Sequence, residues 1–494
     1  MFATDTWSLY VTILLIIYAA VILFFVVRGM RKTKNIDDFA IGSQGFPAWA
    51  VGLSLAASMT SAATFIINPG FIALYGFSGI ISFGIVMPIA IFASLIFFTK
   101  AFQKQGSSVK ALTMAQWIGK RYQSKSMTLF FAFLSLLLIT FIVLICVGLT
   151  QIISKSLNLE PFYVLLGLIV FVFGYMMFGG ANSMVYTNSI QAILMFIVAI
   201  MLIFSGAEYF NEGFDGFVSI LKSIDPNLTS PTNEKSFLFR DYFEIIFCQI
   251  IIGIAIVCQP HIITKTLFLK SEKSVNSYLF IAIACMSLFF LVVVVGLYSR
   301  ILFPDLTLDG VPLKMDELVS AYVVKTFSAG AGVLIVAGLI SAGLSTLENL
   351  IQSISTTIST DLITPLFPSV KKISAVSLNK IVIIILAIVS FLLSYDQILN
   401  PNVSVAIFAQ NGVYAYFAAA FVPVLFGIYF KKVSKNAVFI ASFSAVALHF
   451  IIYYGRITPY MQEPVNNPGV SAAIAIVASF LICNMIYLFS KKKI

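Results

Sequence analysis

Charged side chains are scarce in this sequence. Only 10% of the 494 residues are Asp, Glu, Lys or Arg, whereas hydrophobic residues make up 60%. A soluble protein carries about 25% charged residues, and a folded surface in water needs polar cover. The composition therefore excludes a soluble fold of this length and predicts an all-α integral membrane protein.

Histidine and cysteine are also rare, and their positions exclude several kinds of chemistry. The two histidines lie far apart, and the five cysteines form no Cys-x-x-Cys pair. We therefore expect neither a His/Cys metal centre nor a disulfide framework. Paired acids and His-rich helices are missing from the apolar runs as well, so we expect no membrane-embedded enzyme.

Long apolar runs dominate the sequence instead. A helix needs about 20 mostly apolar residues to cross the hydrocarbon core, and windows of that length give thirteen candidate spans. The expected spans are roughly 8–28, 47–69, 75–99, 126–154, 160–179, 184–209, 242–264, 275–301, 330–360, 379–395, 403–430, 436–455 and 468–489.

The placement of the charges supports this count. The first run has its positive charges behind it, so we interpret it as a span with an outside N-terminus and not as a signal peptide. From that start, 22 of the 30 Lys and Arg residues, Lys265 among them, fall on the cytoplasmic side, and fifteen of the 20 acids fall outside. This asymmetry explains the net charge of +10 without nucleic acid. We expect a monomeric, multi-pass protein of the inner (plasma) membrane with a cytoplasmic C-terminus and no appended soluble domain.

Small and hydroxyl side chains are concentrated in the middle of the second span. Ser58, Thr60, Ser61 and Thr64 lie there, and Asn68-Pro69-Gly70 follows. The pattern suits a tight helix-packing face. It also suits a broken helix whose freed carbonyls and hydroxyls line a site at mid-membrane.

One face of the ninth span is polar. Ala342, Ser345, Glu348, Asn349 and Gln352 recur at intervals of three and four residues, which places them on one side of a helix. Glu348 is the only carboxylate that we place in the hydrocarbon region. A buried carboxylate must be protonated, paired or bound to a cation, so Glu348 is either a coupling residue or a satisfied packing residue.

The seventh span ends in Gln259-Pro260-His261-Ile262. Proline removes a backbone donor and breaks or kinks a helix. His261 is either a proton carrier or a structural hydrogen-bond donor at a helix end, and we favour the second interpretation.

Four motifs in register over about 35–435 resemble the solute:sodium symporter family. They are Asp37-Asp38-Phe39 with Gly42, Gly179-Gly180 with Val185, Thr187 and Gln191, Gln259-Pro260-His261-Ile262, and Ser345-Thr346. The resemblance implies the leucine-transporter (LeuT) type of fold, a 5+5 inverted repeat in which spans two and seven are discontinuous. It divides the chain into an N-terminal helix and loop (1–46), a first repeat (47–210), an extracellular loop (211–241), a second repeat (242–430) and two C-terminal helices with a short cytoplasmic tail (431–494).

The resemblance also implies sodium-coupled import of a small organic solute by alternating access. The family's shared sodium site would consist of the carbonyls of Ala57, Thr60 and Ala342 and the hydroxyls of Ser345 and Thr346. Sodium is a hard cation that takes oxygen ligands, as calcium and magnesium do. Neutral oxygens bind a monovalent ion weakly enough to release it again, which transport requires.

A further cation site is less clear from the sequence. Some members of the family place an aspartate after the Gly-Gly turn, where this chain has Asn188. Because Glu348 replaces a hydroxyl position of that site, we expect a second cation site formed by Asn188, Glu348 and Asn349. The alternative is a proton-coupled solute transporter of the same fold that uses Glu348, or a Glu348 that contacts the substrate.

The substrate is narrowed but not identified. We expect Ser58, Ser61, Thr64 and Gln259 to contact it. The family's sialic acid carriers have an arginine in the third core helix, and 138–147 contains none. The sugar carriers have polar and acidic residues in the second core helix, and 77–97 is almost wholly apolar. Proline, pantothenate and small monocarboxylates remain as candidates.

Overall fold

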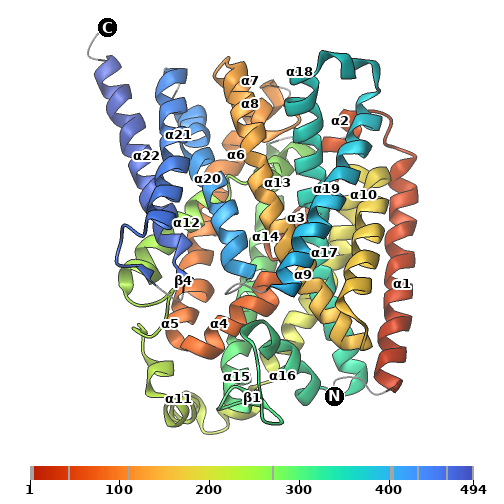
Figure 1. The fold of residues 1–494 in the computed structure, drawn as a ribbon, viewed down its shortest axis with the longest axis vertical. Helices are drawn as coiled ribbons and strands as arrows, with labels where there is room; N and C mark the ends of the chain where they lie inside the picture. The colour runs from red at the N-terminus through yellow and green to blue at the C-terminus, as the bar shows by residue number, and fades with distance from the viewer. Residues whose placement is uncertain are drawn as a thin grey trace.

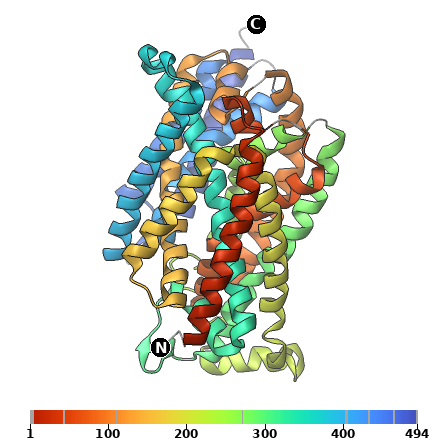
Figure 2. The same cartoon turned by 90° about the vertical axis from the view of Figure 1, so that its right-hand side faces the viewer.

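The computed structural model describes residues 5–42, 45–109, 111–269, 272–400, 405–430, 433–462 and 465–491. These residues are almost entirely helical, as the composition predicts, with two short antiparallel strand pairs. Most helices run along the long axis of the molecule (Figures 1 and 2), and α1, in red, covers much of its height in the second view. The start of the expected span 403–430 and the residues 492–494 of the expected tail lie outside the described residues.

The elements follow one another in two halves of the chain. The first half contains α1 (Asp5–Met30), α2 (Ile36–Ile41), α3 (Ala48–Met59), α4 (Asn68–Tyr75), α5 (Phe77–Gly79), α6 (Met87–Val109), α7 (Met114–Arg121), α8 (Lys125–Leu134), α9 (Ile139–Leu157), α10 (Pro161–Phe204) and α11 (Gly213–Ile224). The second half contains α12 (Gln249–Ile256), α13 (Pro260–Ile263), α14 (Lys273–Leu291), α15 (Val295–Leu302), β1 (Thr307–Leu308), β2 (Val311–Pro312), α16 (Leu318–Thr326), α17 (Ala329–Thr357), α18 (Thr364–Leu366), α19 (Ala375–Leu399), α20 (Val405–Tyr429), α21 (Lys435–Gly455), β3 (Met461–Gln462), β4 (Val465–Asn466) and α22 (Pro468–Lys491).

The described part of the chain contains ten helices that are long and apolar enough to cross a membrane, or up to twelve if each of two bent helix pairs is one span. The longest, α10, is two helices merged across a kink at Gly180, whose φ of 55° and ψ of −159° are not helical. It covers both of the spans expected at 160–179 and 184–209. The chain is therefore an all-helical, multi-pass membrane protein.

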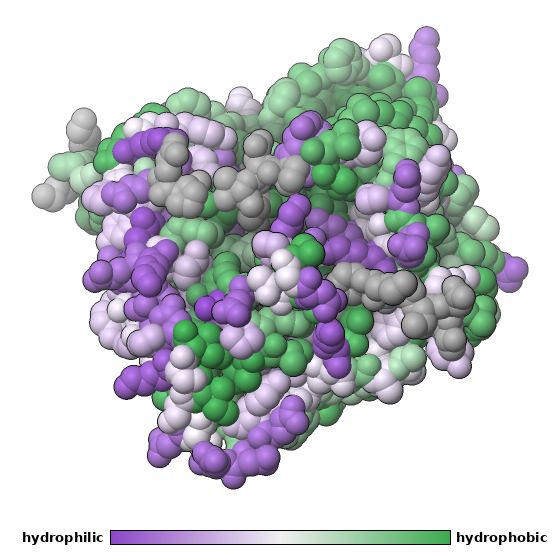
Figure 3. All heavy atoms as spheres, turned by 60° about the horizontal axis from the view of Figure 1, so that its bottom comes forward, coloured by the Kyte–Doolittle hydropathy of each residue, from purple (hydrophilic) through white to green (hydrophobic). Residues whose placement is uncertain are grey.

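The outer faces of the helices are apolar. Large side chains such as Phe280, Phe204 and Tyr163 are 76%, 69% and 66% exposed. Figure 3, in which the bottom of the molecule comes forward, shows hydrophilic side chains interspersed with hydrophobic surface. Exposed apolar area on this scale would be a liability in water, and it is the surface that a lipid bilayer solvates.

Two helices are broken at the centre of the molecule, as the resemblance implies. The axes of Ala48–Met59 and Ala63–Tyr75 meet at 54°, and those of Phe243–Ile256 and Pro260–Phe268 meet at 57°. At the first break Thr60 has a φ of −107° and a ψ of 88°. Backbone groups at such breaks lose their helical partners and become free to bind ligands or other side chains.

The second break corrects one expectation. The expected break is present at Pro260, which lies in the first turn of the new helical segment, a position suited to proline. Helical structure then continues past the expected end of the span at 264 to Phe268. Lys265 is consequently 1% exposed, so the expectation that it lies in a cytoplasmic loop is wrong.

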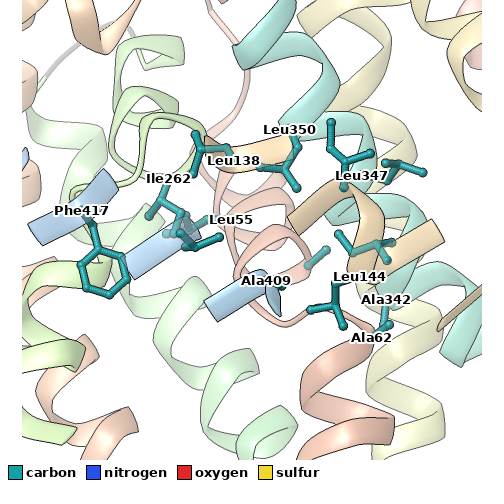
Figure 4. Packing of buried hydrophobic residues seen from close by; sticks show 14 of the residues in the cluster. Leu55, Ala62, Leu138, Leu144, Ile262, Ala342, Leu347, Leu350, Ala409 and Phe417 are labelled. Atoms are coloured by element: carbon teal, nitrogen blue, oxygen red, sulfur yellow. The ribbon is translucent and has the colours of Figure 1, made fainter. Parts of the chain in front are cut away.

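The core lies where the broken helices meet their neighbours. The first broken helix packs through α3 against α10, α14 and α17. Figure 4 shows apolar side chains from both broken helices and from the helices around them, among them Leu55, Ile262, Leu347 and Ala409, gathered in this region.

The α10 helix turns sharply at Gly180. A Cβ atom there would lie 2.7 Å from the Phe39 ring and 2.8 Å from the Phe39 carbonyl oxygen, and the φ of 55° is one that L-residues rarely adopt. Glycine therefore permits both the kink and the close approach of α2.

We expect Gly180→Ala to destabilise the protein by at least about 1 kcal/mol, because a left-handed φ alone costs an L-residue about that much. The measurement is the thermal unfolding temperature of the detergent-purified protein. Gly174→Ala in the same helix is the matched control, since a Cβ there meets nothing within 4 Å. Equal unfolding temperatures for the two variants would contradict this account of the kink.

Two adjacent acidic residues, Asp316 and Glu317, lie directly before α16. Lys155 of α9 forms a 2.8 Å salt bridge with Glu317. Burial raises the pKa of the neighbouring Asp316 to about 6, with a further rise from Glu317 and a partial offset from Lys155 and Lys314. The folded chain therefore binds a proton at Asp316 more tightly than the unfolded chain does, and the folded state loses stability as the pH rises through 6.

Lowering the pH from about 7.5 to 5 should accordingly contribute to folded-state stability through Asp316, by at most about 1.4 kcal/mol per pH unit. In Asp316→Asn this contribution should disappear, and the unfolding temperature should change less between the two pH values. Asp309→Asn, at an exposed turn, is the control and should keep the wild-type response. An unchanged response in Asp316→Asn would refute the assignment.

Candidate functional site

The polar face of α17 meets the first helix break. The Ser345 hydroxyl donates to the carbonyl oxygen of Ala57 at 2.8 Å and to that of Ala342 at 3.1 Å. The Thr346 hydroxyl donates to the carbonyl of Ser58 at 3.2 Å and to that of Ala342 at 3.4 Å. Two adjacent hydroxyls of one helix thus face the carbonyls at the end of α3.

Four of the five oxygens expected to bind sodium are joined by these contacts, and they come from Ala57, Ala342, Ser345 and Thr346. The fifth expected ligand is the carbonyl of Thr60, a residue that is buried at the break. The Thr60 hydroxyl, which is not an expected ligand, donates to the Ala56 carbonyl. The donor set consists of neutral oxygens, which suits a monovalent hard cation that must be released again.

The hydrogen-bond donors to Glu348 come from a different helix, α10. Its carboxylate accepts hydrogen bonds from the Tyr175 hydroxyl at 2.6 Å, the Thr187 hydroxyl at 2.8 Å and the Gln191 amide at 3.1 Å. All three donors belong to α10. Each of these three neighbours can donate to a carboxylate, and the three bonds compensate part of the cost of burying it.

The other expected ligands of a second cation have separate partners. Asn188 donates from its amide to the Ser54 hydroxyl at 3.2 Å, and Asn349 donates to the Ser345 carbonyl. Sequence reasoning missed the remaining neighbour, Lys265, which donates to the Ser54 carbonyl at 2.9 Å and to the Ser54 hydroxyl at 2.6 Å. Spacing four residues after His261 was the only available signal, and it is meaningful only if the helix continues past Pro260.

A cavity of about 110 Å³ lies beside the first break. All four residues expected to contact substrate, Ser58, Ser61, Thr64 and Gln259, line it. The remainder of the wall is largely apolar and aromatic, with contributions from Phe83, Met87, Phe141, Leu144, Ile262, Phe290, Val413 and Tyr414. No Asp, Glu, Lys or Arg is among the described residues that line it.

Two cavity side chains carry polar atoms with no hydrogen-bond partner within the described structure. They are the two ring nitrogens of the buried His261 and the side-chain oxygen of the buried Gln259. The interpretation of His261 as a structural donor is therefore wrong. Buried polar groups are costly when unsatisfied, so these atoms are suited to the polar end of a ligand.

The fold is that of a known transporter. A Na+-coupled sialic acid symporter, solved in a substrate-bound outward-open state, superposes with a TM-score of 0.76 over 96% of this chain and 98% of that one, at 17% sequence identity. At this identity the likeness shows the shared fold alone.

Relatives are found over nearly the whole sequence. The sodium/pantothenate symporter of Escherichia coli is 25% identical over 95% of each chain, and that of Haemophilus influenzae is 24% identical over 82% of each. The sodium/glucose cotransporter of Vibrio parahaemolyticus is 26% identical over 58% of this chain and 55% of its own length.

The family model that matches describes the sodium:solute symporter family and covers residues 39–444. Sodium is a co-transported ion in such proteins, neither a cofactor nor part of an enzyme's chemistry. The activity is accordingly sodium-coupled symport of a small solute. With the fold, the hydroxyl–carbonyl cluster and the family match in agreement, the chain belongs to the sodium:solute symporter family.

Proposed function

We propose that this protein imports a small organic solute with sodium, with the ion bound between α3 and α17 and the solute in the cavity beside them. One observation carries the proposal: the Ser58 carbonyl is a partner of Thr346, and Ser58 also lines the cavity. The ion ligands Ala57, Thr60, Ala342, Ser345 and Thr346 and the solute contacts Ser58, Ser61, Thr64 and Gln259 therefore adjoin at one residue.

The membrane topology that we propose has thirteen crossings. A straight helix of 44 residues would be about 66 Å long, roughly twice the hydrocarbon thickness, so α10 supports two crossings joined at Gly180. α1 starts at the opposite end of the molecule from the end of α22 (Figure 1), as an odd number of crossings requires. The charge asymmetry favours an outside N-terminus. We further propose a plasma-membrane location and, from the family resemblance, inverted repeats at 47–210 and 242–430.

The cavity supports a solute that has both apolar surface and several hydrogen-bonding groups. Its wall offers aromatic and aliphatic contacts, and the unpartnered nitrogens of His261 and the oxygen of Gln259 provide hydrogen bonds. Two relatives that align with 95% and 82% of this chain are sodium/pantothenate symporters, and a rabbit sodium/myo-inositol cotransporter aligns with 92% of it at a lower identity of 22%. We therefore propose pantothenate, or a monocarboxylate of similar polarity, as the solute, and we expect the protein to work as a monomer.

One sodium ion supplies enough energy for such import. An ion that moves down a membrane potential of about 100 mV gains about 2.3 kcal/mol, and a tenfold gradient adds about 1.4 kcal/mol. Together they support an accumulation of roughly a few hundredfold. Coupling through protons at Glu348 is the alternative, but Glu348 does not line the cavity and its carboxylate is held by α10.

The direct test is uptake by proteoliposomes of radiolabelled pantothenate, proline, short monocarboxylates and sialate under an inward sodium gradient. We expect sodium-dependent accumulation of pantothenate or of another monocarboxylate. Uptake that a pH gradient drives equally well in the absence of sodium would favour the proton-coupled alternative and contradict the proposal.

Removing either hydroxyl of the ion site should weaken sodium binding. We expect Ser345→Ala and Thr346→Ala to raise the half-saturating sodium concentration at least tenfold, because each removes one ligand worth about 1.4 kcal/mol or more. Ser355→Ala is the matched control: this hydroxyl is buried on the same helix but bonds only the Gln352 carbonyl. Sodium dependence that is unchanged in both ion-site variants would exclude this location for the ion.

Removing the polar groups of the cavity should weaken solute binding instead. In His261→Ala and Gln259→Ala we expect the KM for the solute to rise about tenfold, since a lost hydrogen bond to a buried partner costs about 1–3 kcal/mol, whereas the sodium affinity without solute should stay near wild type. Thr264→Val, whose side chain bonds the Pro260 carbonyl and does not line the cavity, controls for damage to the half-helix. A KM that rises only in Thr264→Val would overturn the assignment.

A further inference from the structure

Lys265 is a buried cation that the sodium-coupling scheme does not use. It lies in the 3-10 segment Thr264–Phe268 that follows α13, and it is 1% exposed. Its ammonium donates to both oxygens of Ser54, one helical turn before Ser58 in α3. A buried ammonium is expensive unless other groups compensate its charge.

The compensating charge is that of Glu348. Lys265 and Asn188 both donate to the Ser54 hydroxyl, and Thr187, which precedes Asn188 in α10, donates to the Glu348 carboxylate. The buried side chains of Lys265 and Glu348 therefore adjoin one site. Glu348 is held by its three donors from α10, while Lys265 is held by α3. With both groups charged, one fixed positive and one fixed negative charge compensate each other between the two helices.

The oxygens that surround Lys265 are those that a small cation would use. Ser54 offers a carbonyl and a hydroxyl, and the hydroxyl also accepts a bond from Asn188. Asn188 is a residue for which the sequence suggested a second cation site together with Glu348. The ammonium of Lys265 already lies there, on the same oxygens and opposite the same carboxylate.

We propose that the Lys265 ammonium is a built-in substitute for a second coupling ion, so that the protein carries one sodium per transport cycle. This inference rests on the proposed function, because it assumes that sodium binds at Ser345 and Thr346. A tethered ammonium compensates Glu348 in every conformation and is never released, so it draws no energy from the sodium gradient. A second sodium in this region would bring a charge that no further acid balances.

Lys265 limits the number of bound sodium ions because it compensates the charge of Glu348. Variants that remove one of these charges or both distinguish this role from simple packing. In Lys265→Met the carboxylate loses its cation, and a second sodium should take its place. In the double variant Lys265→Met/Glu348→Gln neither charge remains, and the second sodium should be lost again. Lys265→Arg keeps the charge and should behave as wild type.

Equilibrium binding of ²²Na⁺ to the purified full-length protein tests these expectations without any solute. We expect one sodium per protein in wild type, in Lys265→Arg and in the double variant, and two in Lys265→Met with a Hill coefficient above 1. Lys273→Met, which removes an exposed lysine, is the matched control and should bind one. Glu348→Gln alone leaves Lys265 unbalanced and should weaken sodium binding several-fold.

Two results would overturn the inference: two sodium ions bound by wild type, or one ion bound with unchanged affinity by Lys265→Met. The wild-type measurement decides even if Lys265→Met fails to fold. Failure of the proposed function is distinguishable, because wild type would then show no saturable sodium binding that Ser345→Ala weakens.

Discussion

A break in a helix at the centre of a bilayer leaves backbone carbonyls without partners in a medium that offers no water, and the architecture around α3 follows from that constraint. The hydroxyls of Ser345 and Thr346 supply partners for the carbonyls of Ala57 and Ser58. An apolar side chain could not donate a hydrogen bond to these carbonyls, and a charged side chain would be costly to bury there. A weak, exchangeable set of neutral oxygens is therefore what remains at the break, and a small cation can replace the hydroxyl donors there.

Much of this arrangement could be predicted from residue types alone. Hydroxyls crowded into the middle of an apolar run, a proline near the end of another and a polar stripe on a third are local signals, and each one led to residues that meet in the structure. The four expected substrate residues line one cavity because they lie at the two breaks. The hydroxyl pair of α17 and the bend of both helices were likewise visible in the sequence through the family resemblance.

What could not be predicted depends on how the chain continues after a break. A proline marks a helix break in the sequence, but the sequence does not show how far the half-helix after Pro260 continues. Only the tertiary structure decides this. For this reason Lys265 was expected in a loop, whereas the structure places it in the core. The same uncertainty hid the place of His261, whose ring nitrogens are unpartnered beside the cavity. Glu348 was found correctly as a buried acid, but its three donors lie on α10, more than 150 residues away in sequence.

Ser58 has a consequence for the thermodynamics of the cycle. Because its carbonyl accepts a hydrogen bond from Thr346, a proposed sodium ligand, and Ser58 also lines the cavity, a change in the position of this one residue would alter both binding free energies together. Linkage then requires that the factor by which sodium tightens the hold on the solute equals the factor by which the solute tightens the hold on sodium. A substitution that loosens this single backbone position would lower both factors by the same amount, and the carrier would lose obligatory co-movement while it still bound each ligand separately.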